Sequence, residues 1–169
     1  MVVHGYQHHG HQRLRDLQQL HRRAAGLEPE VISYIRTDLS SVTSVRYWCG
    51  WASADPAQSA TPLSALAAFR YDSTVDTDGN WRAVTSTGNS VAQTSVTNTG
   101  IPVTAGGRYR LRVLTTPDVA QFYIDNVLVA THTTNLPPAA ATIGWCCFVT
   151  TLASARRSIL WSRTAVMHD

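Results

Sequence analysis

The fold class of this chain is decided by the stretch Arg108-Tyr-Arg-Leu-Arg-Val-Leu-Thr115 and by Phe122-Tyr-Ile-Asp-Asn-Val-Leu-Val-Ala-Thr-His132, which follows shortly after it. Apolar residues alternate with arginines in the first stretch, and the residues expected to face a core are Tyr109, Leu111 and Val113. In the second stretch, Asp125-Asn126 separates two apolar runs and is typical of a two-residue turn with positive φ at both positions. Together the two stretches predict an antiparallel strand followed by a β-hairpin.

The same kind of pattern extends over residues 30–168, where runs rich in β-branched and aromatic residues are separated by Gly, Pro, Asn or Asp at intervals of about 10 residues. All 14 basic residues are Arg, and the only glutamates are Glu28 and Glu30, so most of the chain lacks the long charged residues that usually cover exposed helices. This composition excludes a helical bundle, and the missing alternation of strands and helices excludes a parallel α/β fold. We therefore expect a single antiparallel β-sandwich over residues 29–169.

Residues 1–28 differ from the rest, because they hold five of the seven histidines and most of the net charge of +3. Residues 11–27 contain no Pro and predict an amphipathic helix, which Gly26 and Pro29 end. The apolar stripe of this helix and the two arginines beside it are Leu14, Leu17, Leu20, Ala24, Leu27, Arg22 and Arg23. Since so short a helix is marginally stable alone, we predict that the stripe binds partner subunits. Docking on its own domain and a nucleic-acid-binding arm are the alternatives.

The cysteines and the termini give little sign of a secreted protein. Cys49, Cys146 and Cys147 are an odd number without metal-binding spacing, so buried free thiols are expected, and a single bridge from Cys49 to Cys146 or Cys147 is the alternative. The N-terminus lacks an apolar signal core, and no apolar run approaches the roughly 20 residues that a membrane span needs. We expect a protein that is not exported through a signal peptide.

The order of the predicted strands resembles the concanavalin A-like, laminin-G-like jelly-roll domains of bacteriophage virion proteins. The most specific part of the resemblance is the hairpin at residues 122–132, which is similar to the Phe-Tyr-Ile-Asn-Gly-x-Leu-Val-Ala hairpin that recurs in such domains. The resemblance spans residues 44–168 and includes nothing of the N-terminal arm. It implies two curved antiparallel sheets packed face to face, in a protein that decorates a capsid or belongs to a head or tail fibre.

Catalytic and metal sites are not indicated. Jelly-roll glycoside hydrolases need two carboxyl groups about 5–5.5 Å apart, whereas Asp72, Asp76 and Asp78 fall on or beside a turn, where we expect solvated, ordinary carboxylates. His132 is expected at the surface and lies in no nucleophile signature. Residues 76–80 carry several side chains with oxygen atoms, as a calcium-binding loop does, but they lack the bidentate Glu of such a loop. A plain turn is therefore favoured. We predict no catalytic residue, no metal ligand and no cofactor, with structural calcium from distant loops left open.

Two sets of side chains are candidates for binding. Trp48 and Trp145 lie in apolar runs and are expected in the core, whereas Trp81 follows an Asp-Gly-Asn turn and is expected to be the most exposed tryptophan. The candidate glycan contacts are Trp81, Asp78 and Asn80. The second set is the three arginines that alternate with apolar residues in the stretch 108–115, namely Arg108, Arg110 and Arg112. We expect them on a solvated outer face, and a clamp for an anionic partner is the alternative.

The sequence therefore predicts a non-enzymatic structural protein of a bacteriophage particle, a capsid decoration protein or a component of a head or tail fibre. It would assemble through residues 1–28 with virion proteins such as the major capsid protein or neighbouring fibre subunits. It would also form a homo-oligomer, for example a trimer. It would be made in the host cytoplasm and reside in the virion, with no nucleic acid or membrane as partner. The alternative is a carbohydrate-binding, lectin-like module that attaches to glycans of the host surface.

Overall fold

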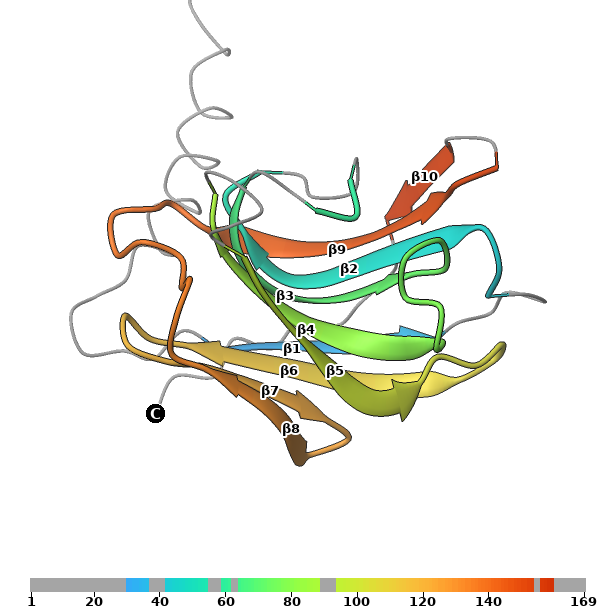
Figure 1. Cartoon of the computed structure of the whole chain (residues 1–169), viewed down its shortest axis with the longest axis horizontal. Coiled ribbons are helices and arrows are strands. Elements are labelled where there is room, and N and C mark those ends of the chain that lie inside the picture. The colour runs from blue at the N-terminus through green and yellow to red at the C-terminus, as the bar shows by residue number, and fades with distance from the viewer. Residues whose placement is uncertain are drawn as a thin grey trace, which may run out of the picture.

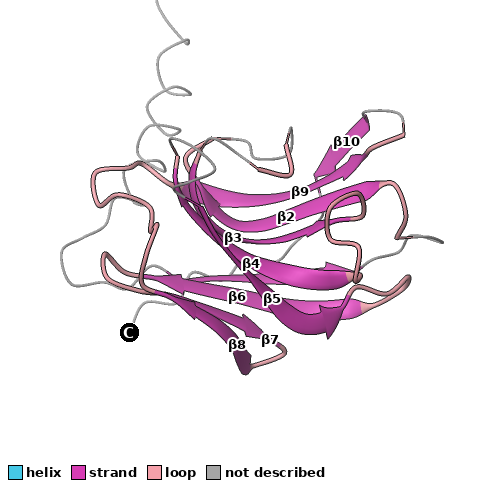
Figure 2. Cartoon of the chain, in the orientation of Figure 1, coloured by secondary structure: helices cyan, strands magenta, loops and turns pink. Residues whose placement is uncertain are grey.

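The computed structural model describes residues 30–36, 42–54, 59–61, 64–88, 94–153 and 156–159. Within these ranges the chain forms ten strands and no helix (Figure 2), so none of the described residues belongs to a helix that could cross a membrane. In chain order the strands are β1 (Glu30–Arg36), β2 (Val45–Ala52), β3 (Ala65–Asp72), β4 (Asn80–Thr87), β5 (Thr94–Pro102), β6 (Arg108–Thr115), β7 (Ala120–Ile124), β8 (Val127–His132), β9 (Gly144–Thr151) and β10 (Arg156–Ile159).

The strands form two sheets that pack face to face (Figure 1). One sheet has four strands in the order β1-β6-β7-β8, and the other has six in the order β10-β9-β2-β3-β4-β5. All pairings between neighbouring strands are antiparallel. The prediction of an all-β antiparallel sandwich is confirmed. The predicted helical arm, with its stripe and the domain boundary near residue 28, lies outside the described residues.

The segments that decided the fold class behave as their patterns predict. Tyr109, Leu111 and Val113 of β6 are buried between the sheets, because alternate side chains of a strand point to opposite faces. Asp125 and Asn126 join β7 to β8 with φ values of 50° and 71°, the backbone of a primed two-residue turn. Local sequence therefore sets this part of the four-stranded sheet.

Aromatic side chains fill the space between the sheets. Phe69 of β3 meets Phe122 of β7 edge to face with ring centroids 5.4 Å apart, and Trp81 of β4 meets Tyr109 of β6 in the same way at 5.5 Å. Trp81 is 0% exposed, so the prediction that it is the most exposed tryptophan is wrong. The strand begins at Asn80, and Trp81 is its first residue to point toward the facing sheet.

His132, predicted at the surface, is also buried, at 6% exposure. It ends β8, where the edge of the four-stranded sheet approaches β4 and β5 of the other sheet. Its Nδ1 lies 2.8 Å from the hydroxyl oxygen of Thr85, and its Nε2 lies 2.8 Å from that of Thr97. Burial lowers the pKa of His132, so the neutral ring is favoured there. The histidine thus connects the two sheets at one edge of the sandwich.

The six-stranded sheet is curved, and in Figure 1 its hollow side faces away from the four-stranded sheet. A second, smaller apolar cluster lies on this outer side and consists of Trp48, Ala52, Leu66, Ala68, Val84 and Cys146, with Phe148 packed against it. The indole nitrogen of Trp48 donates a hydrogen bond to the carbonyl oxygen of Ser59 at 3.2 Å. Residues 59–61 therefore cover part of the hollow side, and both faces of β3 are buried.

Candidate functional site: a polar row across the hollow sheet

The hollow side of the six-stranded sheet carries one row of side chains that crosses five strands in register. Phe148 on β9 pairs with Trp48 on β2, Trp48 with Arg70 on β3, Arg70 with Arg82 on β4, and Arg82 with Asn98 on β5. Neighbouring strands lie about 4.8 Å apart, so the row extends for about 19 Å. We call these residues the outer row: Phe148, Trp48, Arg70, Arg82 and Asn98.

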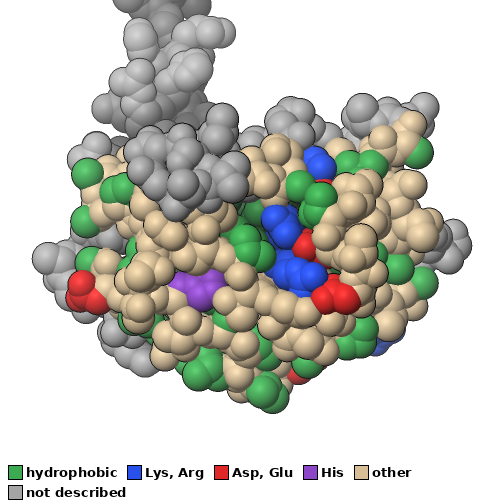
Figure 3. Space-filling view, viewed as in Figure 1, with side chains coloured by type: hydrophobic (Ala, Val, Ile, Leu, Met, Phe, Trp, Pro, Cys, Tyr) green, Lys and Arg blue, Asp and Glu red, His purple; other side chains and the backbone are tan. Residues whose placement is uncertain are grey.

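The outer row changes from apolar to polar along its length. Phe148 is partly buried and Trp48 fully buried in the outer apolar cluster, and the guanidinium carbon of Arg70 lies 5.9 Å from the centroid of the Trp48 ring. Asn98, at the other end, is exposed. Arg and Asp side chains gather near the middle of the face that Figure 3 shows. The exposed part of the site is therefore its polar end.

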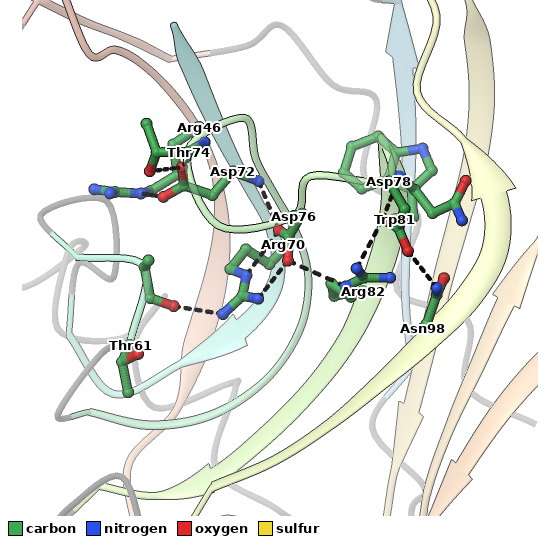
Figure 4. Close-up of polar contacts among 12 residues, drawn as sticks. Arg46, Thr61, Arg70, Asp72, Thr74, Asp76, Asp78, Trp81, Arg82 and Asn98 are labelled. Carbon is green, nitrogen blue, oxygen red and sulfur yellow. Dashed lines mark hydrogen bonds and ion pairs between the residues drawn. The ribbon is translucent and has the colours of Figure 1, made fainter. Parts of the chain in front are cut away.

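Asp76, from the turn between β3 and β4, holds the two arginines of the outer row together (Figure 4). Its Oδ1 accepts hydrogen bonds from Arg70 Nη2 at 2.6 Å and from Arg82 Nε at 3.1 Å. Its Oδ2 accepts from Arg70 Nε at 3.1 Å and from the backbone nitrogen of Asp72 at 2.8 Å. The side chain of Asp76 is only 2% exposed. This carboxylate is therefore a fixed centre of the site and not a freely solvated group.

Asp72 makes a second buried ion pair beside the first. Its Oδ2 lies 2.5 Å from Arg46 Nε, and its Oδ1 accepts from the hydroxyl and the backbone nitrogen of Thr74 at 2.6 and 2.9 Å. Burial alone raises the pKa of Asp72, but the hydrogen bonds from Thr74 and Arg46 outweigh it, so the pKa lies below its ordinary value. The prediction that Asp72 and Asp76 are solvated, ordinary carboxylates is wrong, because the turn folds back onto the sheet and presents them to arginines of β2, β3 and β4.

Asp78 lies at the exposed end of the site, with its side chain 39% exposed. Its Oδ1 accepts hydrogen bonds from Arg82 Nη2 at 2.7 Å and from the backbone nitrogen of Asn80 at 3.2 Å, and its Oδ2 accepts from Asn98 Nδ2 at 2.5 Å. The hydrogen bond from Arg82 lowers the pKa of Asp78, so this carboxyl stays ionised at neutral pH. Asp78 and Asn80, predicted from the sequence, lie together here, whereas Trp81 points to the opposite face.

Residues 59–61 cover part of the site but not its end at Asp78 and Asn98. Arg70 Nη1 donates to the carbonyl oxygen of Ala60 at 2.6 Å, which places residues 59–61 over Arg70 as well as Trp48. Arg82, with 13% of its side chain exposed, lies between this covered part and the exposed Asn98. The polar set at this end is therefore the exposed Asp78 and Asn98 together with Arg82, which is mostly buried and joins Asp78 to Asp76, and we call these three residues the exposed triad.

The charges of the site balance. Three arginines (Arg46, Arg70, Arg82) lie among three aspartates (Asp72, Asp76, Asp78), and each of these carboxylates contacts a guanidinium. Within the part of the chain that the structure describes, no cluster of three or more His, Cys, Asp or Glu residues could hold a metal ion. What the exposed triad offers a ligand is a carboxylate acceptor, a guanidinium donor and an amide with both functions.

Sequence reasoning missed Arg70, Arg82 and Asn98 because they share no motif and lie on three different strands. The only signal of their proximity is the alternation of β4, which places Arg82 on the face opposite Trp81. The other arginine row, on β6, lies on the outer face of the four-stranded sheet as expected, with Arg112 stacked over the ring of Tyr123 at 4.6 Å. It takes no part in this site.

Known proteins resemble this chain in fold but not in sequence. No protein-family model matches it, and the search of curated proteins also found no match. The carbohydrate-binding module CBM66 from Bacillus subtilis superposes with a TM-score of 0.50 at 12% identity, over 84% of this chain and 77% of the module. The galectin LEC-6 from Caenorhabditis elegans superposes with a TM-score of 0.48 at 11% identity, over 83% of this chain and 81% of the galectin. At such low identity, the similarity to the module shows a shared β-sandwich fold.

Proposed function

We propose that this protein is a carbohydrate-binding module that holds a neutral glycan at the exposed triad. The observation that supports it is the exposed triad itself, because hydrogen bonds join Asp78 to Arg82 and to Asn98 on the hollow side of the curved sheet. Arg82 is also held in place by its hydrogen bond to the buried Asp76. The side chains are thus oriented before any ligand arrives, which reduces the entropy lost on binding. The fold shared with a carbohydrate-binding module is consistent with this proposal at the level of architecture.

The chemistry of the site fits hydroxyl groups better than ions. A sugar hydroxyl both donates and accepts, so one hydroxyl can donate to Asp78 while a neighbouring one accepts from Arg82 or from the amide of Asn98. An anion would be repelled by the carboxylate of Asp78, and a cation by the guanidinium of Arg82. Because the three arginines and three aspartates balance, the site has no net charge that would favour either.

We propose further that the protein binds without catalysis. A glycosidase needs one carboxylic acid that remains protonated near neutral pH, which requires a raised pKa. Asp78, the exposed carboxyl of the site, has a lowered pKa because it accepts a hydrogen bond from Arg82. Asp76 is enclosed between Arg70 and Arg82 and is 2% exposed, so it does not face a substrate. The carboxyl groups of this site are arranged as hydrogen-bond acceptors and not as an acid and nucleophile pair.

The test is a glycan array followed by calorimetric titration of the best neutral oligosaccharide. We expect Asn98→Ala and Asp78→Asn each to weaken binding at least tenfold, with only a small change in thermal unfolding, because both side chains are exposed. Thr131→Ala is the matched control, since Thr131 is exposed on β8 in the other sheet. Absence of binding to every neutral glycan, or equal binding by all variants, would refute the proposal. Hydrolysis of a bound glycan would refute the statement that the protein binds without catalysis.

The virion role predicted from the sequence remains a separate prediction. It depends on residues 1–28, which lie outside the described part of the chain, so the structure does not test it. A glycan-binding module is compatible with a place on a virion, so the two functions are tested by different experiments. Incorporation into particles tests the virion role, and the glycan titration tests the exposed triad.

A further inference from the structure

Two of the three cysteines face each other inside the sandwich. Cys49 on β2 and Cys147 on β9 are directly paired in the antiparallel register, and their sulfur atoms lie 2.8 Å apart. Each is 1% exposed. The two residues are separated by 98 positions in the chain, so only the pairing of β2 with β9 brings them together.

The positions of both backbones suit a covalent bond. Directly opposed residues of an antiparallel pair have Cα atoms about 4.5–5.5 Å apart, which lies within the range of about 4.4–6.8 Å that disulfides span. The two sulfurs need to approach by less than an ångström from 2.8 Å to reach the covalent length of about 2.05 Å. We propose that Cys49 and Cys147 form a disulfide that joins β2 to β9 in the mature protein.

The third cysteine is excluded by the geometry of the strand. Cys146 precedes Cys147, so its side chain points to the opposite face of the sheet, where it packs in the outer apolar cluster with Trp48. The residue paired with Cys146 on β2 is Gly50, which has no side chain. Of the other two cysteines, Cys147 is therefore the one within reach of Cys49, and the proposed disulfide does not involve Cys146.

The bond forms by thiol–disulfide exchange with a small disulfide such as oxidised glutathione. The thiolate of one cysteine attacks the glutathione disulfide and releases one glutathione thiolate. The thiolate of the other cysteine then attacks the resulting mixed disulfide, which forms the protein disulfide and releases the second glutathione. Two thiol protons are lost, and oxidised glutathione takes up the two electrons. In the closed sandwich, burial raises the pKa of Cys49 and keeps it protonated, so the exchange takes place during folding, before the core excludes the reagent.

The experiment uses the full chain, unfolded under reducing conditions and refolded with reduced and oxidised glutathione. Free thiols are then blocked in denaturant and counted by mass spectrometry. We expect one blocked thiol in place of three, and a non-reduced tryptic digest in which peptide 47–70 is linked to peptide 113–156. Cys146→Ala should retain the linked peptides, whereas Cys147→Ala, its neighbour in the chain, should lose them. The midpoint of urea unfolding should fall on reduction of the wild type and of Cys146→Ala.

Three blocked thiols in the refolded, soluble wild-type protein would overturn the proposal. So would a linked digest that disappears in Cys146→Ala, because the bridge would then use the wrong cysteine. The count on the wild type does not depend on any variant, so the proposal stays testable even where Cys147→Ala fails to fold.

Discussion

Replacing Asp76 by Asn tests how the polar site is held together. The carboxylate accepts three hydrogen bonds from Arg70 and Arg82 and one from the backbone, with 2% of its side chain exposed. The two arginines are themselves only 8% and 13% exposed. Asn has nearly the same shape but no charge, so it leaves two buried guanidinium groups without their common counterion.

The magnitude follows from the burial of all three groups. Removing one partner of a buried ion pair costs about 3–5 kcal/mol, since an uncompensated charge remains inside. With a urea dependence of about 2 kcal/mol/M, this loss lowers the unfolding midpoint by about 1.5–2.5 M. We expect a shift in this range for Asp76→Asn, followed by tryptophan fluorescence and circular dichroism. Asp118→Asn, at an exposed turn, is the control and should unfold near the wild-type midpoint.

A midpoint for Asp76→Asn within about 0.5 M of the wild type, or about 1 kcal/mol, would refute the reasoning. That result would mean that water or neighbouring groups solvate the arginines well enough to replace the carboxylate. It would also remove the argument that Arg82 is held in place for a ligand.

Because the pKa of His132 in the folded state is lowered below its ordinary 6.5, its contribution to stability is complete above about pH 6.5 and is lost as the pH falls below that value. Urea midpoints measured from pH 8 to 5 should therefore decline less steeply in His132→Asn than in the wild type, and equal slopes would contradict the assignment. Gly50→Ala should fail to fold or lose more than about 3 kcal/mol, because its Cβ would lie 2.5 Å from the carbonyl oxygen of Ala67 and 2.6 Å from the Cα of Ala68 at a φ of 152°. Soluble expression and thermal unfolding would show this, and a variant as stable as the wild type would contradict it. Deletion of residues 1–27, which precede β1, should leave a folded sandwich that no longer assembles or joins particles. Circular dichroism measures the fold, solution mass measures assembly, and incorporation into particles is measured directly. Retained assembly would contradict the predicted role of the arm.

The parts of the fold that could be predicted from the sequence are those set by neighbours in the chain. The alternation in β6 and the Asp125-Asn126 turn are local, and the structure confirms both. Trp81 and His132 were misplaced because strand alternation gives two faces without saying which one meets another sheet. In this protein the outer face of β3 is also buried, so polarity alone did not distinguish core from surface there.

The candidate site could be predicted only in part. Asp78 and Asn80 belong to one short turn, and their proximity follows from the chain itself. The rest of the site depends on register: Arg70, Arg82 and Asn98 become neighbours only when three strands pair with the observed offsets. A shift of one residue in any pairing would turn one of these side chains to the other face.

What the sequence by itself determined about this protein is the kind of structure it forms. The scarcity of helix-forming charged residues, the period-two alternation and the turn residues all act over a few residues, and together they require antiparallel strands. The tertiary structure alone decided which arginines meet which aspartates, which cysteines face each other and which tryptophan is buried. These contacts join residues as many as 98 positions apart, and their partners are chosen by how two sheets pack and not by any short segment of the chain.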